Sequence, residues 1–519
     1  MRSYPVNEMD MGFAAPPRIF KVFSLILVWC LFLGLGFQLF YHRPVFIQNN
    51  VIDTSVKTPV ADFQIGTVNS ELLEETIKNE SNLPIAFWEK VHVKKNMFYK
   101  NSSCSPLPNI LELEYNNIHW QTVNTTNGTF YLLSAYYDDR EMNPLKATVR
   151  IIGMINRVDP QVSTTCQLWF EDRNEPVFSK IEEYKYIWHL KWGGITQGTN
   201  QPYLMTCKVP ADMKGKIPVA VSVVENKCDK AQNILKVRYS TPPEKKDFVV
   251  CVKGLDFLHK DLSVRLVEWI ELLGILGADK VVLYELQAHP NISRILRYYE
   301  NTHQVEVIPL TLPGKHPNAP FLQHMYLTNK LTEKRKHEVI PYNDCFYRNM
   351  NSYRFVVLLD IDEVIMPKSM SSWRELIEHV NTTKKASCYY ARNVYFLDDL
   401  QHSHGWFLDI PQHLHMLQHV YRTKNYTRPG HFVKSFHNTE IVKTLHNHFP
   451  MSCLTSCFNV AINESDAQLQ HYRADCVGGL KKVCQDYRKD VVVDTSIWKF
   501  KEELIKRTTN TFQKLGIIP

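Results

Sequence analysis

Apolar and polar positions divide the chain into three kinds of segment. Residues 22–41 form an uncharged apolar run, VFSLILVWCLFLGLGFQLFY. Between residues 85 and 245, short β-rich runs alternate with turn residues, without an extended run of helical period. From residue 246 onward, apolar strands alternate with amphipathic helices. This pattern predicts a membrane anchor, a β-rich domain and an α/β domain.

The apolar run predicts one N-terminal transmembrane helix. At 1.5 Å per residue, its 20 residues span about 30 Å, the thickness of a bilayer core. The run exceeds the apolar part of a cleaved signal peptide, which has about 7–15 residues. We interpret it as a signal-anchor that follows a cytosolic tail (residues 1–21) and precedes a stem (residues 42–84). A cleaved signal peptide is the alternative.

Glycosylation motifs predict which side of the membrane the body occupies. Eight Asn-x-Ser/Thr triplets follow the apolar run and none precedes it, which favours a luminal C-terminal part. The candidate asparagines are Asn79, Asn101, Asn124, Asn127, Asn291, Asn381, Asn425 and Asn463.

Cysteines and charge agree with a secretory-pathway protein. Eleven of the 12 cysteines follow the apolar run, so disulfides are expected, with at least one cysteine unpaired or intermolecular. Cys453 and Cys457 fit a disulfide better than a zinc site, because no companion ligand pair follows at finger spacing. The net charge of +7 is spread along the chain, so no nucleic-acid partner is expected.

The two folded domains differ in the period of their apolar residues. The β-rich part predicts a β-sandwich-like domain, because turn signals separate its short strands. The α/β part predicts right-handed βαβ units and a parallel sheet. In the first domain the clearest predicted strands are 130–137, 147–155, 166–170 and 217–224. In the second, predicted strands are 248–252, 281–284, 305–308 and 355–359, with helices at 262–276, 292–301 and 341–351.

The motif Asp360-Ile361-Asp362 follows the most apolar strand of the α/β part. Ligands of open α/β sheets bind at the carboxyl ends of strands, and two carboxylates at positions i and i+2 there can address one cation. Oxygen ligands suit Mn²⁺ or another hard divalent cation, which would bridge the diphosphate of a nucleotide-sugar. The same pair could instead cap the next helix. A haloacid-type phosphatase would also place an Asp-x-Asp after a strand, but at its first strand, whereas three strand–helix units come first here.

Three further residues are candidates for binding the nucleotide-sugar. Lys253 follows the first predicted strand, near the expected nucleotide site. Glu285 ends the second strand, where its carboxylate could accept from the ribose or uracil. Arg473 could form a fork-like pair with a phosphate.

Several stretches, in a consistent order, resemble glycosyltransferase family 92. They are Tyr136-Tyr-Asp-Asp-Arg140, Val281-Val-Leu-Tyr-Glu-Leu286, Asn343-Asp-Cys345, Leu359-Asp-Ile-Asp-Glu-Val364, Lys434-Ser-Phe436 and His471-Tyr-Arg473. The resemblance implies a GT-A-type (Rossmann-like) fold, UDP-galactose as donor, Mn²⁺, and inversion at the anomeric carbon. It also implies β-linked galactose on a terminal galactose or fucose of a glycoprotein N-glycan, in the Golgi. The resemblance fits two members of the family equally well, the vertebrate β-galactoside β-1,4-galactosyltransferases and the nematode core-fucose galactosyltransferase.

The resemblance also suggests roles for two more residues. His471 would be the third metal ligand, by similarity to the late histidine of GT-A enzymes, with His446 and His448 as alternatives. Asp344 matches a family position and is a candidate for nucleotide-sugar binding. Its alternative is a helix N-cap-type role.

Inversion requires a general base that deprotonates the acceptor hydroxyl. We favour Asp409, which follows the aromatic stretch Gly405-Trp406-Phe407, and we also retain Glu363. The remaining candidates are Asp398, Asp399 and Glu440. A membrane-anchored glycan-binding protein with an inactive transferase domain is the alternative function. Asp360, Asp362 and His471 argue against it, because loss of activity should erode such a site.

Overall fold

The computed structural model describes residues 82–90, 104–173, 175–380, 385–476, 486 and 488–517. All of them belong to one unit, residues 69–519. The predicted tail, transmembrane helix and most of the stem lie outside the described residues, as do Asn79, Asn101 and Asn381. Within the described ranges, no helix combines the length and apolar character needed to cross a membrane.

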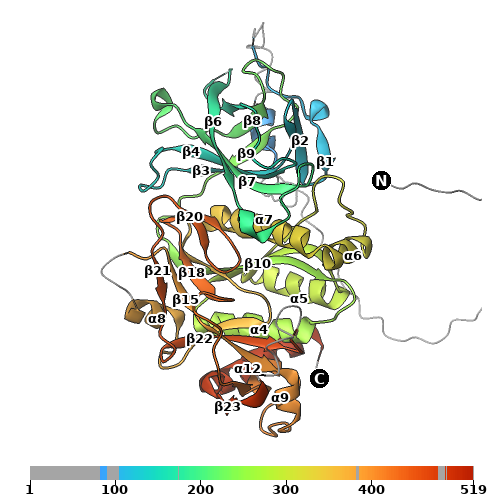
Figure 1. Cartoon of the computed structure of the whole chain (residues 1–519), viewed down its shortest axis with the longest axis vertical. Helices are drawn as coiled ribbons and strands as arrows, with labels where there is room; N and C mark the ends of the chain where they lie inside the picture. Colours follow the sequence, from blue (N-terminus) through green and yellow to red (C-terminus); the bar gives the residue numbers. More distant parts are fainter. Residues whose placement is uncertain are drawn as a thin grey trace, which may run out of the picture. The chain divides into compact units, whose positions relative to one another are not determined.

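The β-rich domain is a sheet of nine strands, part of which closes on itself (Figure 1). The strand order is β1-β2-β3-β4-β7-β6-β5-β8-β9, and β9 pairs back onto β3. The strands are β1 (Tyr115–Asn117), β2 (Trp120–Thr125), β3 (Gly128–Asp138), β4 (Thr148–Ile155), β5 (Thr165–Trp169), β6 (Val177–Tyr186), β7 (Gln201–Lys208), β8 (Ala220–Val224) and β9 (Leu235–Arg238). Short 3-10 helices are η1 (Ile110–Glu112), η2 (Leu190–Trp192) and η3 (Ala211–Met213).

The closure corrects the predicted sandwich-like arrangement. The first half of β3 pairs with β2, whereas Ala135 and Tyr136 in its second half pair with Val237 and Arg238 of β9. Strand β3 therefore pairs with β4 along one edge and with both β2 and β9 along the other. The seven strands from β3 to β9 form a barrel. Pairing of the two edges leaves fewer unpaired backbone groups than two separate sheets would.

The α/β domain is built on a seven-stranded sheet of order β12-β11-β10-β13-β18-β15-β21. Strands β10 to β13 are mutually parallel as predicted, whereas β18 runs antiparallel to both β13 and β15. The strands are β10 (Lys246–Phe257), β11 (Lys280–Ala288), β12 (Val305–Pro309), β13 (Tyr353–Leu358), β15 (Cys388–Ala391), β18 (Lys434–Asn438) and β21 (Asn459–Ala461).

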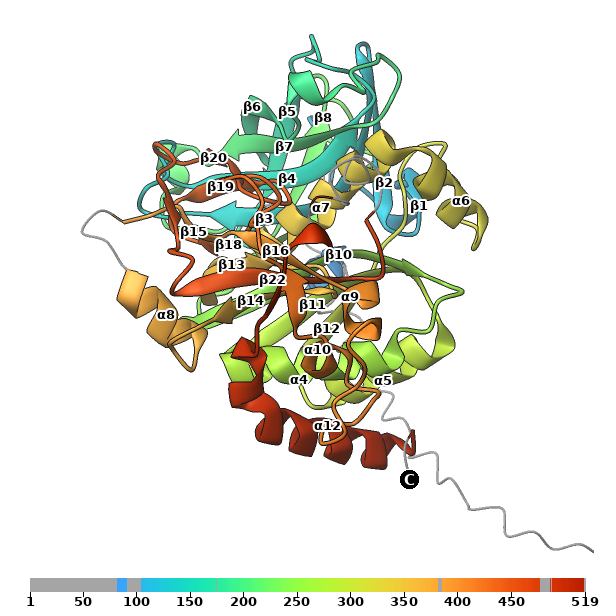
Figure 2. The ribbon, with the colours of Figure 1, turned by 60° about the horizontal axis from the view of Figure 1, so that its bottom comes forward.

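Helices cover both faces of this sheet, as Figure 2 shows. Helices α4, α5 and α12 pack on the face that Val250 and Val252 present. Helix α7 packs on the face of Val249 and Cys251, and barrel residues belong to the same core cluster. The helices are α4 (Ser263–Leu276), α5 (Pro290–Asn301), α6 (Leu322–Asn329), α7 (Leu331–Asn349), α8 (Trp373–Val380), α9 (Asp398–His402), α10 (His415–Gln418) and α12 (Lys501–Leu515). The predicted end of α4 is confirmed at Gly277, which has φ +103°.

Smaller sheets extend the domain beyond β13. The chain turns from β13 into β14, which lies in a three-stranded sheet of order β14-β22-β16. The turn between the two sheets contains Asp360 and Asp362. The remaining elements are β14 (Glu363–Pro367), β16 (Asn393–Leu397), β17 (Tyr421–Thr423), β19 (Val442–Leu445), β20 (Pro450–Cys453), β22 (Ala467–Arg473), β23 (Val491–Val493) and η5 (Ser496–Phe500).

Disulfides occur in both domains. The described pairs are Cys104–Cys228, Cys166–Cys207, Cys251–Cys345 and Cys453–Cys457. The last pair agrees with the disulfide predicted there. Cys388 is a free, buried thiol.

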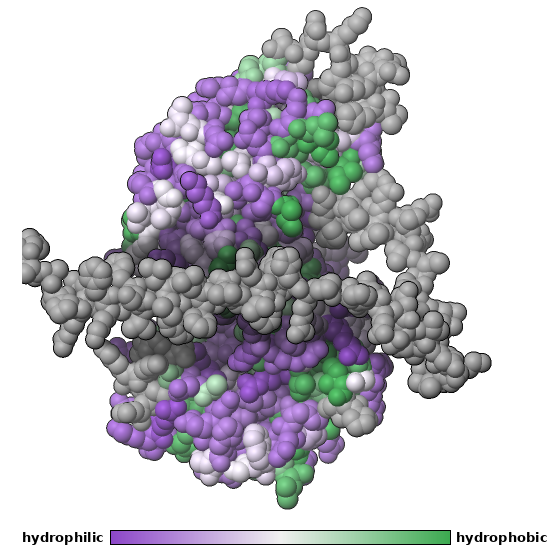
Figure 3. All heavy atoms as spheres, turned by 90° about the vertical axis from the view of Figure 1, so that its right-hand side faces the viewer, coloured by the Kyte–Doolittle hydropathy of each residue, from purple (hydrophilic) through white to green (hydrophobic). Residues whose placement is uncertain are grey.

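Four of the predicted glycosylation sites are exposed at the surface. The face shown in Figure 3 is largely hydrophilic, with hydrophobic atoms in small separate patches. Asn124, Asn291, Asn425 and Asn463 are exposed, whereas Asn127 is half-buried. Their glycosylation stays a prediction.

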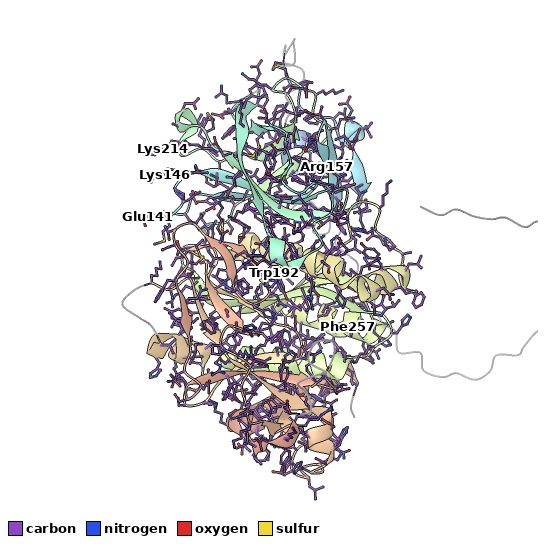
Figure 4. All side chains as sticks on the ribbon, in the orientation of Figure 1. Glu141, Lys146, Arg157, Trp192, Lys214 and Phe257 are labelled. Carbon is purple, nitrogen blue, oxygen red and sulfur yellow. A yellow bond between two sulfur atoms is a disulfide. The ribbon has the colours of Figure 1, made fainter. Side chains whose placement is uncertain are left out.

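A buried ion cluster joins the barrel to the α/β domain. Asp138 accepts hydrogen bonds from Arg140 Nε (2.8 Å) and Arg150 Nε (3.1 Å). Arg140 also donates to the carbonyls of Thr439 and Val442, both at 2.6 Å. The ring of Trp192, which Figure 4 places between the barrel and the α/β domain, lies 4.4 Å from the His446 ring, centroid to centroid. The Tyr136–Arg140 stretch therefore serves the junction of the two domains.

This cluster should make the protein sensitive to acid. Burial raises the pKa of Asp138, but Arg140 and Arg150 outweigh it and lower the pKa from 3.8 to about 2. A lowered pKa contributes stability above the unfolded value, and this contribution of about 2.5 kcal/mol should be lost as the pH falls from about 4 to about 2. Denaturant unfolding should show that D138N is less stable at pH 7 and loses less stability over this pH range. Its exposed neighbour Asp139 supplies the control, D139N, which should behave like wild type.

Candidate active site

The turn after β13 is fixed by a reciprocal pair of hydrogen bonds. The Glu363 backbone N–H donates to the Asp360 carbonyl, and the Asp360 N–H donates to Glu363 Oε2, both at 3.0 Å. Trp269 of α4 donates from Nε1 to the Glu363 carbonyl at 2.9 Å. The two aspartates are thus held on a rigid turn at the carboxyl end of a buried strand.

Two lysines neutralise the inner carboxylates of this turn. Lys253 Nζ, on β10, lies 3.2 Å from Asp360 Oδ2 and 3.4 Å from Glu338 Oε1 on α7. Lys434 Nζ, at the start of β18, lies 2.9 Å from Glu363 Oε2 and 3.5 Å from Asp360 Oδ2. The Lys434 side chain has no exposed surface. Asp360 is therefore a half-buried carboxylate whose charge is compensated by two lysines.

Polar groups from α7 and the loop after β19 complete the surroundings of Asp360. Tyr342 donates from its hydroxyl to Asn447 Oδ1 at 3.0 Å and lies 3.4 Å from Asp360 Oδ1. Lys434 donates to the same Asn447 oxygen at 2.7 Å. The network connects four separate segments of the chain around one carboxylate.

His471 lies beside the outer carboxylate. Strands β14 and β22 pair so that Glu363 and His471 are direct register partners. His471 Nε2 is 3.5 Å from Asp362 Oδ2, and Nδ1 is 3.4 Å from Glu363 Oε1. The Asp362 side chain is 43% exposed, whereas that of His471 is 12% exposed. The pair therefore offers one oxygen and one nitrogen donor at the edge of the buried group.

Neighbouring charges set the protonation of the three carboxyl groups. Burial raises the pKa of Asp360, but Lys253, Lys434 and His471 hold it well below the ordinary value. Burial likewise raises the pKa of Asp362, and His471 outweighs it, so this pKa is lowered too. The pKa of Glu363 is raised, because burial and the charge of Asp360 outweigh Lys434. Both aspartates are thus ionised at neutral pH, as cation ligands must be.

The three predicted metal ligands differ in their surroundings. Asp362 and His471 lie together with free access to solvent at Asp362, whereas the Asp360 carboxylate faces Lys253, Lys434 and Tyr342. The alternatives His446 and His448 have other contacts: His446 packs on Trp192, and His448 Nδ1 lies 2.9 Å from the Val433 carbonyl. The arrangement favours His471 over both.

Asp344 lies elsewhere, which corrects its assignment to nucleotide-sugar binding. It is inside α7, 2% exposed, and accepts from the hydroxyls of Ser134, Tyr136 (2.7 Å) and Tyr284 (2.5 Å). Arg348 Nη2 is 3.4 Å away. The N-cap alternative is also wrong, because Asp344 is in the interior of the helix. Asp344 fastens the barrel to α7 and β11, beside a groove of about 730 Å³ that contains none of the Asp360–His471 group.

Substituting Asp344 should therefore affect stability rather than donor binding. The amide introduced by D344N keeps one acceptor oxygen but turns its NH2 group toward donors on the other side, so we expect a loss of about 1–3 kcal/mol. Denaturant unfolding measures this, and the Kd for UDP should be unchanged. D212N, on an exposed 3-10 helix, is the control. A weaker Kd with unchanged stability would restore the nucleotide-binding interpretation.

The other predicted nucleotide-sugar residues are dispersed. Glu285 is inside β11 rather than at its end, half-buried, with Ser293 Oγ 3.4 Å from Oε1. Arg473 ends β22, two residues beyond His471, and so extends from the same face of that strand. Lys253 contacts Asp360 directly.

The candidate bases are mostly engaged in other contacts. Asp409 is 72% exposed and pairs with Lys501 of α12, so its predicted role as the base is not supported by position. Asp399 pairs with Arg488 at 2.8 Å, and Glu440 pairs with Lys245. Glu363 lies in the group but is 3% exposed, with its oxygens facing Lys434, His471 and the Asp360 N–H. We infer that Glu363 positions the turn.

Sequence reasoning missed Lys434, Tyr342 and Asn447 as members of the site. Lys434 begins one of the family-like stretches, which was the available signal. Tyr342 and Asn447 carried no signal, because only the tertiary packing of α7 against the loop after β19 brings them to Asp360.

Searches of curated proteins and of solved structures gave only limited matches. No curated protein gave a significant match. The solved structures of Staphylococcus aureus TarS 1-349, alone and with UDP, align at 14% and 13% identity with TM-scores of 0.18 and 0.17, each over 29% of this chain and 35% of the other. The WbbM bifunctional glycosyltransferase aligns at 13% identity and TM-score 0.17, over 32% of this chain and 28% of the other. Such short alignments, about a third of each relative, carry no argument about this fold or site.

The family comparison is decisive. The model described as Glycosyltransferase family 92 matches residues 246–508, just over half of the chain. That span starts at β10 and includes Asp360, Asp362, Lys434 and His471. The chain belongs to glycosyltransferase family 92.

Proposed function

We propose that this protein is an inverting, divalent-cation-dependent galactosyltransferase that moves galactose from UDP-galactose to a terminal galactose or fucose of a glycoprotein N-glycan. The observation that carries the proposal is the pair of Asp362 and His471, 3.5 Å apart, beside Asp360 at the carboxyl end of β13. The pair lies within the family 92 domain.

The donor set suits Mn²⁺ or a similar ion. Asp362 would bind through its accessible carboxylate and His471 through Nε2, with Asp360 reaching the ion through water. Carboxylate and imidazole are both accepted by Mn²⁺, whereas Mg²⁺ prefers oxygen alone. When bound, the ion would offset the charge that develops on the leaving diphosphate.

The reaction itself is a single displacement at the anomeric carbon. A bond forms from the acceptor hydroxyl oxygen to C1 of galactose as the bond from C1 to the diphosphate oxygen breaks. The electron pair leaves on UDP, and the hydroxyl proton passes to a base. Lys253 and Lys434 keep Asp360 ionised, and Glu363 keeps the turn rigid, so both aspartates are in position before the donor binds.

The surroundings of Asp360 also argue against the phosphatase alternative. A nucleophilic aspartate must reach a phosphorus atom, but the Asp360 carboxylate is enclosed by two lysines and Tyr342. A phosphorylated Asp360 after incubation with a phosphate ester would contradict this argument.

A donor-by-acceptor screen of the full-length protein tests the proposal. We expect turnover with UDP-galactose and galactose- or fucose-terminated N-glycans, loss of turnover in EDTA, and recovery on adding Mn²⁺. Linkage analysis should show a β-anomer. Transfer from another sugar nucleotide alone would refute the donor, and an α-linked product would refute inversion.

We further propose that the protein is a Golgi membrane protein whose catalytic part faces the lumen, anchored by residues 22–41. Support comes from the sequence pattern and the disulfides, which suit an oxidising compartment. Protease protection of the C-terminal part in intact vesicles would test this orientation, and digestion without detergent would contradict it.

A further inference from the structure

A second group of potential metal ligands lies outside the site described above. Asp398, His415 and His419 each direct one ligand atom into a common space, and these atoms lie within 4.8 Å of one another. Among the described residues, this is the single cluster of three such groups. Both histidines are buried, and the Asp398 side chain is 17% exposed.

The group is distinct from the Asp362–His471 pair. The His415 ring lies 6.1 Å from that of Tyr472, whereas Tyr395 lies 5.4 Å from His471. Since successive strand residues point to opposite faces, Tyr472 and His471 face opposite sides of β22. The two groups therefore lie on opposite faces of the β14-β22-β16 sheet.

Hydrogen bonding directs a lone pair of His419 at the carboxylate. His419 Nδ1 donates to the His415 carbonyl at 2.6 Å, so Nε2 is the ring nitrogen left to act as a ligand. Nε2 then carries a lone pair and lies 3.3 Å from Asp398 Oδ1. Within the described part of the chain, this fully buried nitrogen has no hydrogen-bond partner. A proton on Nε2 or a metal ion between the two atoms would join this nitrogen to the carboxylate oxygen.

The spacing fits zinc. His415 Nε2 is hydrogen-bonded to Asp398 Oδ1 at 2.9 Å, and His419 Nε2 is 3.3 Å from the same oxygen. Zinc–nitrogen and zinc–oxygen bonds of about 2.1 Å give tetrahedral ligand separations of about 3.4 Å. Two imidazoles and a carboxylate are a donor set that zinc binds, with water as the fourth ligand.

Further contacts hold the three ligands in place. Glu268 of α4 accepts from the backbone N–H groups of Met416 (2.9 Å) and Leu417 (3.0 Å), which fixes α10. Arg265 Nη2 is 3.6 Å from the other Asp398 oxygen, Oδ2. Such outer contacts orient ligands in protein metal sites.

We propose that Asp398, His415 and His419 bind a structural Zn²⁺ ion that closes the segment 399–414. Asp398 immediately precedes this segment, and His415 and His419 follow its end. The segment exposes two large apolar side chains, Trp406 (40% exposed) and Leu408 (fully exposed). A metal that ties both ends of a loop restricts its opening, so the ion would hold these side chains in a defined position.

Zinc binding by the full-length protein tests the proposal. After removal of metals with a chelator, zinc is titrated without nucleotide-sugar against a chromophoric indicator. We expect one tightly bound Zn²⁺ per chain, a tetrahedral d–d spectrum with Co²⁺, and slower proteolysis within residues 399–414 when zinc is present. These three measurements use the wild-type protein and do not depend on a variant that folds.

Variants locate the ion. H415A and H419A should bind zinc at least about tenfold more weakly. The control H413A removes a neighbouring histidine that faces Phe512 and should bind normally. D362A should also retain the zinc, because that residue is on the other face of the sheet. Absence of zinc binding by the wild type would overturn the proposal, as would normal binding by H415A and H419A, or loss of the zinc in D362A.

Discussion

Replacing Asp362 with alanine is expected to reduce glycosyl transfer by about a thousandfold, with little effect on the stability of the protein. Asp362 is the accessible carboxylate of the site, and its partner His471 lies 3.5 Å away. In the proposed mechanism Asp362 would help to hold a divalent cation, which would supply charge stabilisation to the leaving group, and electrostatic groups of this kind are worth about 10²–10³ in kcat. Because Asp362 is 43% exposed, the fold does not depend on its carboxylate.

The measurement is turnover of UDP-galactose with a saturating glycan acceptor over a range of Mn²⁺ concentrations. D409A is the control, since Asp409 is an exposed aspartate paired with Lys501. It should retain activity, and a large loss there would return Asp409 to the role of base. Full activity in D362A, or equal activity with and without cation, would contradict the assignment of the site.

The sequence was most informative about local structure. Each predicted strand and helix is present, because apolar period and turn residues act over short distances. Boundaries were less accurate. The helix predicted over 341–351 is α7, which starts ten residues earlier, at Leu331, and passes through Pro341. The Asn343 side chain donates to the Val339 carbonyl at 2.7 Å within this helix.

Pairing between distant segments could not be predicted. The strands of the barrel were visible in the sequence, but its closure depends on one strand, β3, having partners on both sides. Similarly, His471 was placed by family resemblance, and its position beside Asp362 comes from the register of β14 against β22. The register of these two strands cannot be inferred from the spacing of residues along the sequence.

The family-like stretches proved to serve two purposes. Tyr136, Tyr284 and Asp344 come from three different stretches, yet they meet in one buried hydrogen-bond network at the domain junction. Lys434 and His471, from two others, meet at the carboxylates after β13. A motif can therefore mark a junction as readily as a substrate site, and burial in the structure distinguishes the two.

Replacing Lys434 with methionine should give the largest loss of stability, about 3–5 kcal/mol, because it leaves the buried Glu363 and the half-buried Asp360 without their shared cation. Lys434 has no exposed surface and lies 2.9 Å from Glu363 and 3.5 Å from Asp360. Denaturant unfolding at pH 7 measures the change. K501M, which removes the partner of exposed Asp409, is the matched control and should unfold like wild type.

A second substitution separates loss of charge from loss of packing. If the uncompensated carboxylates cause the instability, E363Q should recover part of it in a K434M background, since glutamine keeps an oxygen for the Asp360 N–H and removes one negative charge. If instead methionine simply packs poorly, E363Q will add its own destabilisation. A K434M protein as stable as wild type would show that Lys253 alone, 3.2 Å from Asp360, compensates the charge of the turn.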